Sequence, residues 1–165
     1  ERMNQVKQKK YLIGIIAVSF LFILSGCGKA VFSGKTVEPQ EWADKIRTSG
    51  QFTDQMTELG TSAALKRYTV SQSEANACAV YVGTGATAEE LSVWKAKDAK
   101  SAEAILQNAK VLVVSQESTY ASYRPSEVPK LKNAVVEQQD TIVVLCVSAD
   151  SAKAKQVIQN LFDGR

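Results

Sequence analysis

The sequence predicts an α+β fold in which a four-stranded antiparallel sheet is built from two strand–strand–helix units, with both long helices on one face and a helical segment before the first unit. Two observations lead to this prediction. Two pairs of short segments rich in β-branched and aromatic residues are each joined by a tight turn. Each pair is followed by an aspartate and then by apolar residues at helical spacing.

The segment before the first unit is predicted to be helical in two places. Pro39 suits the first turn of a helix that continues to about Thr48 and ends before Gly50. A shorter helix is predicted over residues 62–68, with Thr61 as its capping residue. These helices precede every predicted strand.

The first unit is predicted over residues 77–123. Residues 77–82 and 91–96 have the composition and alternation of two paired strands, and Gly83-Thr84-Gly85 supplies the turn after the first. Asp98 is placed to cap a long helix that continues to about Tyr123. Its predicted apolar face contains Ala102, Ile105, Ala109, Leu112, Val113 and Tyr120.

The second unit repeats this order over residues 134–161. Residues 134–138 and 141–147 are predicted to form a hairpin across Gln139-Asp140, and Asp150 is placed to cap the last helix. Because residues 142–147 are apolar on both sides of the strand, we expect this strand inside the sheet rather than at its edge.

The two predicted long helices also resemble each other in sequence. The residues at 98, 102, 105, 106, 107 and 108 match those at 150, 154, 157, 158, 159 and 160, at a constant offset. We interpret this similarity as two units related by a pseudo-twofold axis. The alternative is a coincidence between two alanine-rich capped helices.

The N-terminus has the pattern of an export signal. Lys7, Lys9 and Lys10 precede an uncharged apolar run over residues 11–26 that is shorter than a membrane-spanning helix requires. The run ends in Leu24-Ser25-Gly26-Cys27, which resembles a lipobox, the signal for acylation of a cysteine followed by cleavage before it. An uncleaved membrane anchor is the alternative. We therefore expect a signal peptide over residues 1–26, a tether lipidated at Cys27 over residues 27–37, and one domain over residues 38–165.

Composition excludes several function classes for that domain. The formal net charge of +3 resides entirely before Cys27, and the remaining chain has equal numbers of acidic and basic residues. A neutral domain lacks the electrostatic signature of nucleic-acid binding. The chain contains no histidine, so catalysis by a histidine-activated nucleophile is excluded, and no acidic cluster has metal-ligand spacing. We expect no metal and no cofactor.

Two cysteines remain in the predicted domain. Cys78 and Cys146 each lie among apolar residues of a predicted strand, so we interpret both as buried free thiols. A disulfide between them is the alternative in an extracytoplasmic protein.

One predicted loop, residues 123–130, is the leading candidate for a contact surface. Two prolines stiffen it, which lowers the entropic cost of binding, and it presents residue types that are frequent at interfaces. The alternative is a rigid connector in which Arg124 pairs with Glu127. The candidate interaction residues are Tyr123, Arg124, Glu127 and Lys130.

Most of the predicted domain resembles an uncharacterised family of Gram-positive lipoproteins known as domain of unknown function 4358. The resemblance covers residues 81–162 and implies no activity, because none is assigned to the family. It rests on residues 81–90 (Tyr-Val-Gly-Thr-Gly-Ala-Thr-Ala-Glu-Glu), 95–98 (Lys-Ala-Lys-Asp), 123–125 (Tyr-Arg-Pro), Glu127 and 130–134 (Lys-Leu-Lys-Asn-Ala), together with the lipobox.

These observations predict a lipoprotein without enzymatic activity, held by its lipid on the outer face of the cytoplasmic membrane and facing the cell wall. Its partners would be that membrane and an envelope protein or small ligand. The alternative is an envelope enzyme that uses a histidine-free site assembled near Ser122, Tyr123 and Lys130.

Overall fold

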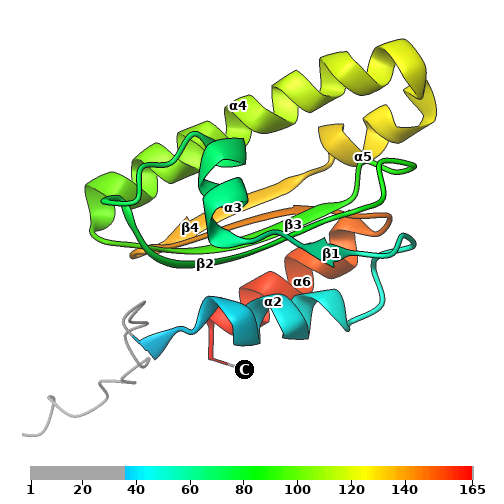
Figure 1. Cartoon of the computed structure of the whole chain (residues 1–165). Coiled ribbons are helices and arrows are strands. Elements are labelled where there is room, and N and C mark those ends of the chain that lie inside the picture. Colours follow the sequence, from blue (N-terminus) through cyan, green and yellow to red (C-terminus); the bar gives the residue numbers. More distant parts are fainter. Residues whose placement is uncertain (1–35, 165) are drawn as a thin grey trace, which may run out of the picture. The chain divides into compact units, whose positions relative to one another are not determined.

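A five-stranded antiparallel sheet forms the middle layer of the domain (Figure 1). The computed structural model describes residues 36–164, so the predicted leader and Cys27 lie outside the described residues. The strand order is β1-β2-β3-β5-β4. The strands are β1 (Thr57–Glu58), β2 (Ala75–Val82), β3 (Glu90–Ala96), β4 (Val135–Gln139) and β5 (Ile142–Val147).

Helices cover both faces of this sheet (Figure 1). One face packs against α3 (Thr61–Tyr68), α4 (Ala99–Tyr123) and α5 (Val128–Lys132), the last of which follows the 3₁₀ turn η2 (Pro125–Glu127). The opposite face packs against α2 (Pro39–Arg47) and α6 (Ser151–Phe162). The domain therefore has three layers and two hydrophobic cores.

The interior strands explain why helices pack on both faces of the sheet. In β3, Val93 lies in the core beside α2 and α6, while its neighbour Trp94 lies in the core beneath α4. All six residues of β5 are buried, and they alternate between the same two cores. Each side chain buried in this way stabilises the fold by about 1.5–3 kcal/mol relative to exposure, so neither face could be left in water. The interior position predicted for β5 is confirmed.

The placement of both long helices on one face is therefore wrong, and so is the pseudo-twofold axis. Strands β3 and β4 both pair antiparallel with β5, which lies between them, so α4 connects two parallel strands across one face. A twofold axis perpendicular to the sheet would relate the two hairpins, but it would keep both helices on one side. Because α6 follows β5 onto the opposite face, the two units are not equivalent.

The sheet also has five strands rather than the four predicted. The additional strand, β1, has only two residues, both exposed, and pairs with Val82 and Tyr81 at the end of β2. A strand this short has no alternation that a sequence pattern could reveal.

Local sequence signals place the starts of the two long helices correctly. The carboxylate of Asp98 accepts a hydrogen bond from the Ser101 N–H (2.8 Å), and that of Asp150 accepts one from the Lys153 N–H (2.9 Å). The caps predicted at these two aspartates are confirmed. The cap predicted at Thr61 is wrong, because Thr61 is the first residue of α3 and Gly60 precedes it as the N-cap, without a side-chain hydrogen bond. Residues 125–132 are helical rather than the loop expected, because each proline lies in a first helical turn, where its missing N–H costs nothing.

The two thiols lie on opposite faces of the sheet. Cys78 packs against the core beneath α4 and is half-buried, whereas Cys146 is fully buried in the core beside α6. Both are free, as predicted. Within residues 36–164, no helix combines the length and apolarity needed to cross a membrane.

The packing of α4 leads to a test of the core. Ile105 is fully buried, so Ile105→Ala should lower the free energy of unfolding by about 2–5 kcal/mol through lost burial and a cavity. Val111, on the same helix, is 68% exposed, and Val111→Ala should change stability by no more than about 0.5 kcal/mol. Urea denaturation of both variants measures the difference, and equal losses would contradict the assigned helix face.

Candidate functional site

The turn between β2 and β3, residues 83–88, is held by side chains from several other segments of the chain. We call it the glycine loop. In Figure 1 it lies beside α5, at the end of the sheet reached by the C-terminal half of α4. Its contacts form a polar network that contains most of the buried charges of the domain.

Asp54 fixes the beginning of the glycine loop. Its carboxylate accepts hydrogen bonds from the Thr84 N–H (2.9 Å) and from the Thr87 hydroxyl (2.7 Å). The Thr87 bond first, and then those from Thr84, lower the pKa of Asp54 to about 2. A Cβ atom at Gly83 would lie 2.6 Å from the Asp54 Oδ2 atom, so any other residue there would displace this carboxylate. Gly85 has φ +86°, a conformation that also favours glycine.

The end of α4 fixes the backbone carbonyls of the same loop. The Tyr120 hydroxyl donates to the Thr87 carbonyl (2.5 Å), the Tyr123 hydroxyl to the Gly85 carbonyl (3.3 Å), and the Arg124 guanidinium to the Ala86 carbonyl. The Tyr120 and Tyr123 rings lie 4.9 Å apart. Burial, followed by the contact with Tyr123, raises the pKa of Tyr120. Three side chains of one helix end therefore determine the path of the loop.

A buried ion cluster lies under the end of the loop. The Lys130 ammonium contacts the Glu89 carboxylate at 3.1 Å and the Glu127 carboxylate at 3.0 Å. Glu127 also accepts a hydrogen bond from the Ala88 N–H (3.0 Å). The Glu89 side chain is completely buried, and it further accepts bonds from the Thr53 N–H (2.8 Å), the Thr53 hydroxyl (2.7 Å) and the Asp54 N–H (2.9 Å).

These contacts keep Glu89 and Lys130 ionised. Burial by itself raises the pKa of Glu89, but the hydrogen bonds from Thr53, Asp54 and Lys130 outweigh it, so the net pKa is lowered. Burial likewise lowers the pKa of Lys130, but its bonds to Glu127 and Glu89 outweigh it, and the net pKa is raised. At neutral pH Glu89 is therefore a carboxylate and Lys130 an ammonium.

The adjacent Glu90 belongs to a separate group of contacts. Its carboxylate receives two bonds from the Arg67 guanidinium, from Nε at 2.7 Å and from Nη2 at 2.6 Å, and a third from the Tyr68 hydroxyl at 2.8 Å. The bond to Glu90 is the main cause of the raised pKa of Arg67. Glu89 and Glu90 therefore act separately, because neighbouring residues of an extended chain face opposite sides.

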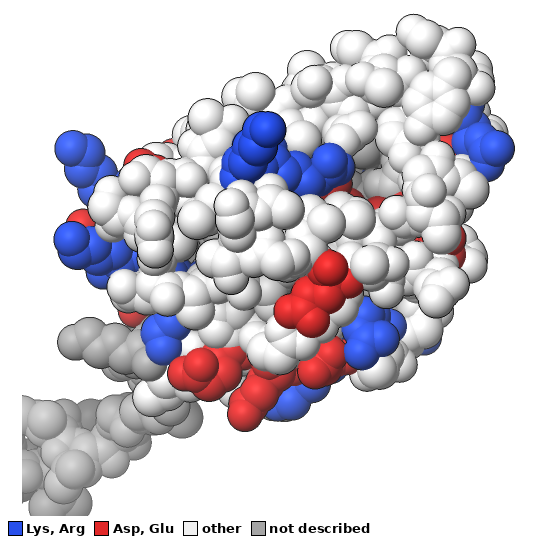
Figure 2. All heavy atoms as spheres, in the orientation of Figure 1, with Lys and Arg blue, Asp and Glu red and all other residues white. Residues whose placement is uncertain are grey.

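A hollow of about 280 Å³ opens between the glycine loop, α3 and α4. Figure 2 shows it beneath α4, with basic atoms at one side and acidic atoms in its depth. Its walls are mostly polar. They are formed by Arg67, Val82, Gly83, Thr84, Gly85, Thr87, Ala88, Glu89, Glu90, Gln116 and Tyr120.

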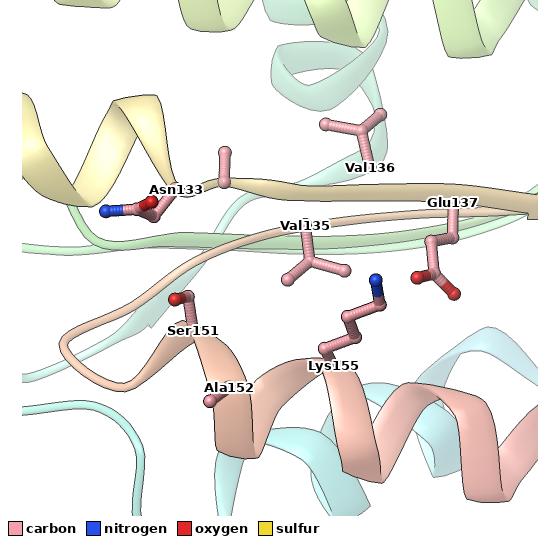
Figure 3. A pocket seen from close by; sticks show the side chains of 8 residues that line it. Asn133, Val135, Val136, Glu137, Ser151, Ala152 and Lys155 are labelled. Carbon is pink, nitrogen blue, oxygen red and sulfur yellow. The ribbon is translucent and has the colours of Figure 1, made fainter.

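A second, more open hollow of about 340 Å³ lies between β4 and α6. In Figure 3, Val135 and Glu137 point from β4 toward α6, and Lys155 extends from α6 toward β4, while Val136 points to the other face. This groove contains no buried charged side chain, since Glu137 is half-buried and Lys155 is exposed. It therefore lacks the fixed polar groups that surround the first hollow.

The structure separates the four candidate interaction residues into two pairs. Tyr123 is 56% exposed and Arg124 is also exposed, so both are available for contact. Glu127 and Lys130 point inward and bind each other. The alternative pairing of Arg124 with Glu127 is wrong, because Arg124 bonds to a carbonyl of the glycine loop instead. Cys27 lies outside the described residues.

The residues proposed for the alternative enzyme have separate partners. The Ser122 hydroxyl donates to the Ser118 carbonyl of its own helix (3.3 Å), the Tyr123 hydroxyl donates to Gly85, and Lys130 is paired with carboxylates. Sequence reasoning missed Asp54 and Tyr120 as partners of the glycine loop, and Arg67 and Tyr68 as partners of Glu90. Between residues 36 and 164, the acidic and cysteine side chains form no group of three or more that could hold a metal ion.

The ion cluster leads to a stability prediction. Lys130→Met leaves Glu89 buried without its cation, which should lower the free energy of unfolding by about 3–5 kcal/mol at pH 7. The stability that ionised Glu89 contributes is present above its ordinary pKa of 4.5 and is lost as the pH falls through its lowered folded-state pKa. The penalty of the substitution should therefore shrink in the same acid range.

Urea denaturation between pH 3 and pH 7 measures this effect. The matched control is Lys132→Met, at an exposed position of the same short helix, which should change stability by no more than about 0.5 kcal/mol. A loss at Lys130 that is equally large at every pH would show that packing of the lysine stem, rather than its charge, stabilises the cluster.

Comparison with known proteins places this network within a family. Residues 48–148 match the family described as Domain of unknown function (DUF4358), and this range includes the whole sheet and the layer of α3, α4 and α5. No curated protein and no solved structure matches the chain. Because the match covers more than half of the sequence, the chain belongs to the DUF4358 family.

Proposed function

We propose that this chain is an extracytoplasmic lipoprotein, anchored to the outer face of the cytoplasmic membrane through Cys27, whose domain binds an envelope component without catalysing a reaction. The order Leu24-Ser25-Gly26-Cys27 after a basic flank and a short apolar run supports the anchor. Two or three acyl chains on that cysteine would suffice for stable attachment, since a single chain is marginal.

The main support for a binding role is that the charged groups of the polar network stay ionised near neutral pH. A general acid or base works best when its pKa is near the working pH. Here hydrogen bonding lowers the pKa of Asp54 to about 2 and that of Glu89 below its ordinary value, while the pKa of Lys130 is raised. These groups keep their charges near neutral pH, which supports a role in holding the glycine loop rather than in transferring protons.

A rigid loop is well suited to binding. Because internal contacts already fix residues 83–88, little conformational entropy would be lost when a partner docks there. The exposed side chains of Tyr123 and Arg124 lie next to this loop and belong to residue types enriched at binding hot spots. The proposed contact surface therefore consists of the glycine loop with these two side chains.

The anchor can be tested by metabolic labelling with a radioactive fatty acid. Cys27→Ala should abolish incorporation of label and leave unprocessed precursor, because no other residue can form the thioether at the lipobox. The control is Cys78→Ala, which changes a thiol inside the folded domain and should leave labelling intact. Label retained on the Cys27 variant would exclude this anchor.

The contact surface can be tested by photo-crosslinking in intact cells. A benzophenone amino acid placed at position 123 should form adducts with an envelope component, because this side chain is exposed beside the glycine loop. The same group at position 111, also exposed on α4 but three turns earlier, serves as the control and should not form those adducts. Identical adduct patterns at both positions, or none at position 123, would argue against the surface.

A further inference from the structure

We propose that the hollow beneath α4 binds a neutral, hydroxyl-rich ligand, a carbohydrate. The inference rests on the proposed binding role of the domain and names the chemical class that its site would take. It follows from the charge, the unused hydrogen-bonding groups and the strand pairing around the hollow.

The charged residues that line the hollow are neutralised by partners. Arg67 forms a two-bond ion pair with Glu90, and Glu89 is paired with Lys130. An ionic ligand would therefore find no unpaired opposite charge in the wall. Because the wall charges are already balanced in pairs, the site favours an uncharged polar ligand.

The two wall carboxylates have little capacity left for a ligand. Glu89 already accepts four hydrogen bonds and its side chain is completely buried. Glu90 accepts three, and its side chain is only 5% exposed. These acids therefore act by orienting their partners rather than by contacting a ligand directly.

Arg67 supplies the free donors. A guanidinium has five N–H groups, and only two of those of Arg67 are used by Glu90. Its side chain is 31% exposed, and it lines the hollow. The ion pair holds its plane in place, so the remaining N–H groups form a fixed fork for ligand oxygens.

Gln116 supplies the complementary group from α4. Its side chain is half-buried at the wall of the hollow, one helical turn before Tyr120. An amide both donates and accepts, and so does a hydroxyl group, whereas a carbonyl only accepts. A guanidinium fork and an amide in the wall of one hollow therefore suit a ligand with several adjacent hydroxyls. The volume of about 280 Å³ is near the lower limit for ligand pockets, which fits one sugar ring at a time.

The strand pairing argues against a peptide in this hollow. Val82 is the last residue of β2, and it pairs with Thr57 on one side and with Glu90 on the other. No free strand edge is therefore available at this wall for an added strand. The small apolar residues of the wall, Val82 and Ala88, also form no side-chain pocket of the kind that anchors a peptide.

Saturation-transfer NMR on the full chain tests the proposal. The protein is kept in a zwitterionic detergent without a sugar headgroup, because a glycosidic detergent would compete for the site. The probes are chitotetraose, cellotetraose and maltotetraose, each compared with its monosaccharide so that a glycan chain is distinguished from a free sugar. A tetra-alanine with blocked ends and inorganic phosphate represent the competing ligand classes.

We expect saturation transfer to at least one saccharide and none to the peptide or phosphate. Gln116→Ala should weaken saccharide binding about three- to tenfold, the effect of one lost hydrogen bond, without altering the fold, since alanine suits a helix. Gln107→Ala is the matched control, because Gln107 is exposed on the same helix, bonds to Glu103 (2.6 Å) and does not line the hollow. Its affinity should be unchanged.

Three results would overturn the proposal. Absence of transfer to every saccharide would exclude the ligand class, and saccharide binding unchanged by Gln116→Ala would place the contact elsewhere. Transfer to the peptide or to phosphate alone would replace carbohydrate by another ligand while leaving the binding role of the domain intact.

Discussion

The buried carboxylate of Glu89 is the point on which the arrangement of this domain depends. It lies just before β3, yet its partners come from residues 53–54 and from Lys130 on α5, which are 35 to 41 positions away in the chain. A buried charge that loses its partners is strongly destabilising, so these three segments have to come together for the native state to form. Once they do, the glycine loop is fixed at both ends, by Asp54 at its beginning and by the bond from Ala88 to Glu127 at its end.

This constraint distinguishes the charged groups that hold the backbone in place from the polar groups that remain able to bind a ligand. Glu89, Glu127 and Lys130 satisfy one another, and Tyr120 and Arg124 are directed to carbonyls of the loop. The network thus uses its charges to hold backbone in place, at a site where Gly83 allows the Asp54 carboxylate to approach closely. The polar groups left over at the adjacent hollow are those of Arg67 and Gln116. A preorganised wall with a few free donors and acceptors is the usual construction of a small-molecule site.

The sequence predicted local structure well and long-range structure only in part. Alternation located four of the strands, and Asp98 and Asp150 marked the starts of α4 and α6, because both signals arise from neighbouring residues. The face on which each helix packs depends on the path of the chain over the sheet, and no local sequence pattern determines that path. The two apolar sides of β5 nevertheless indicated that helices must pack on both faces of the sheet. The ion cluster was missed for the same reason. Its only signal was a pair of glutamates at the start of an otherwise apolar strand, which cannot be buried without partners elsewhere in the chain.

The two outer layers of the domain differ in what they do for the site. Helices α2 and α6, from the two ends of the described chain, meet through Trp42 and Phe162, whose rings lie 5.1 Å apart, and together they close the core on one face of the sheet. The hollow and the glycine loop belong to the opposite layer, with α3, α4 and α5, which the family match includes. The first described helix, α2, lies on the face of the sheet opposite to that layer. The sheet therefore separates the α2–α6 layer from the hollow, so a ligand held there would contact the layer of α3 and α4 together with the glycine loop.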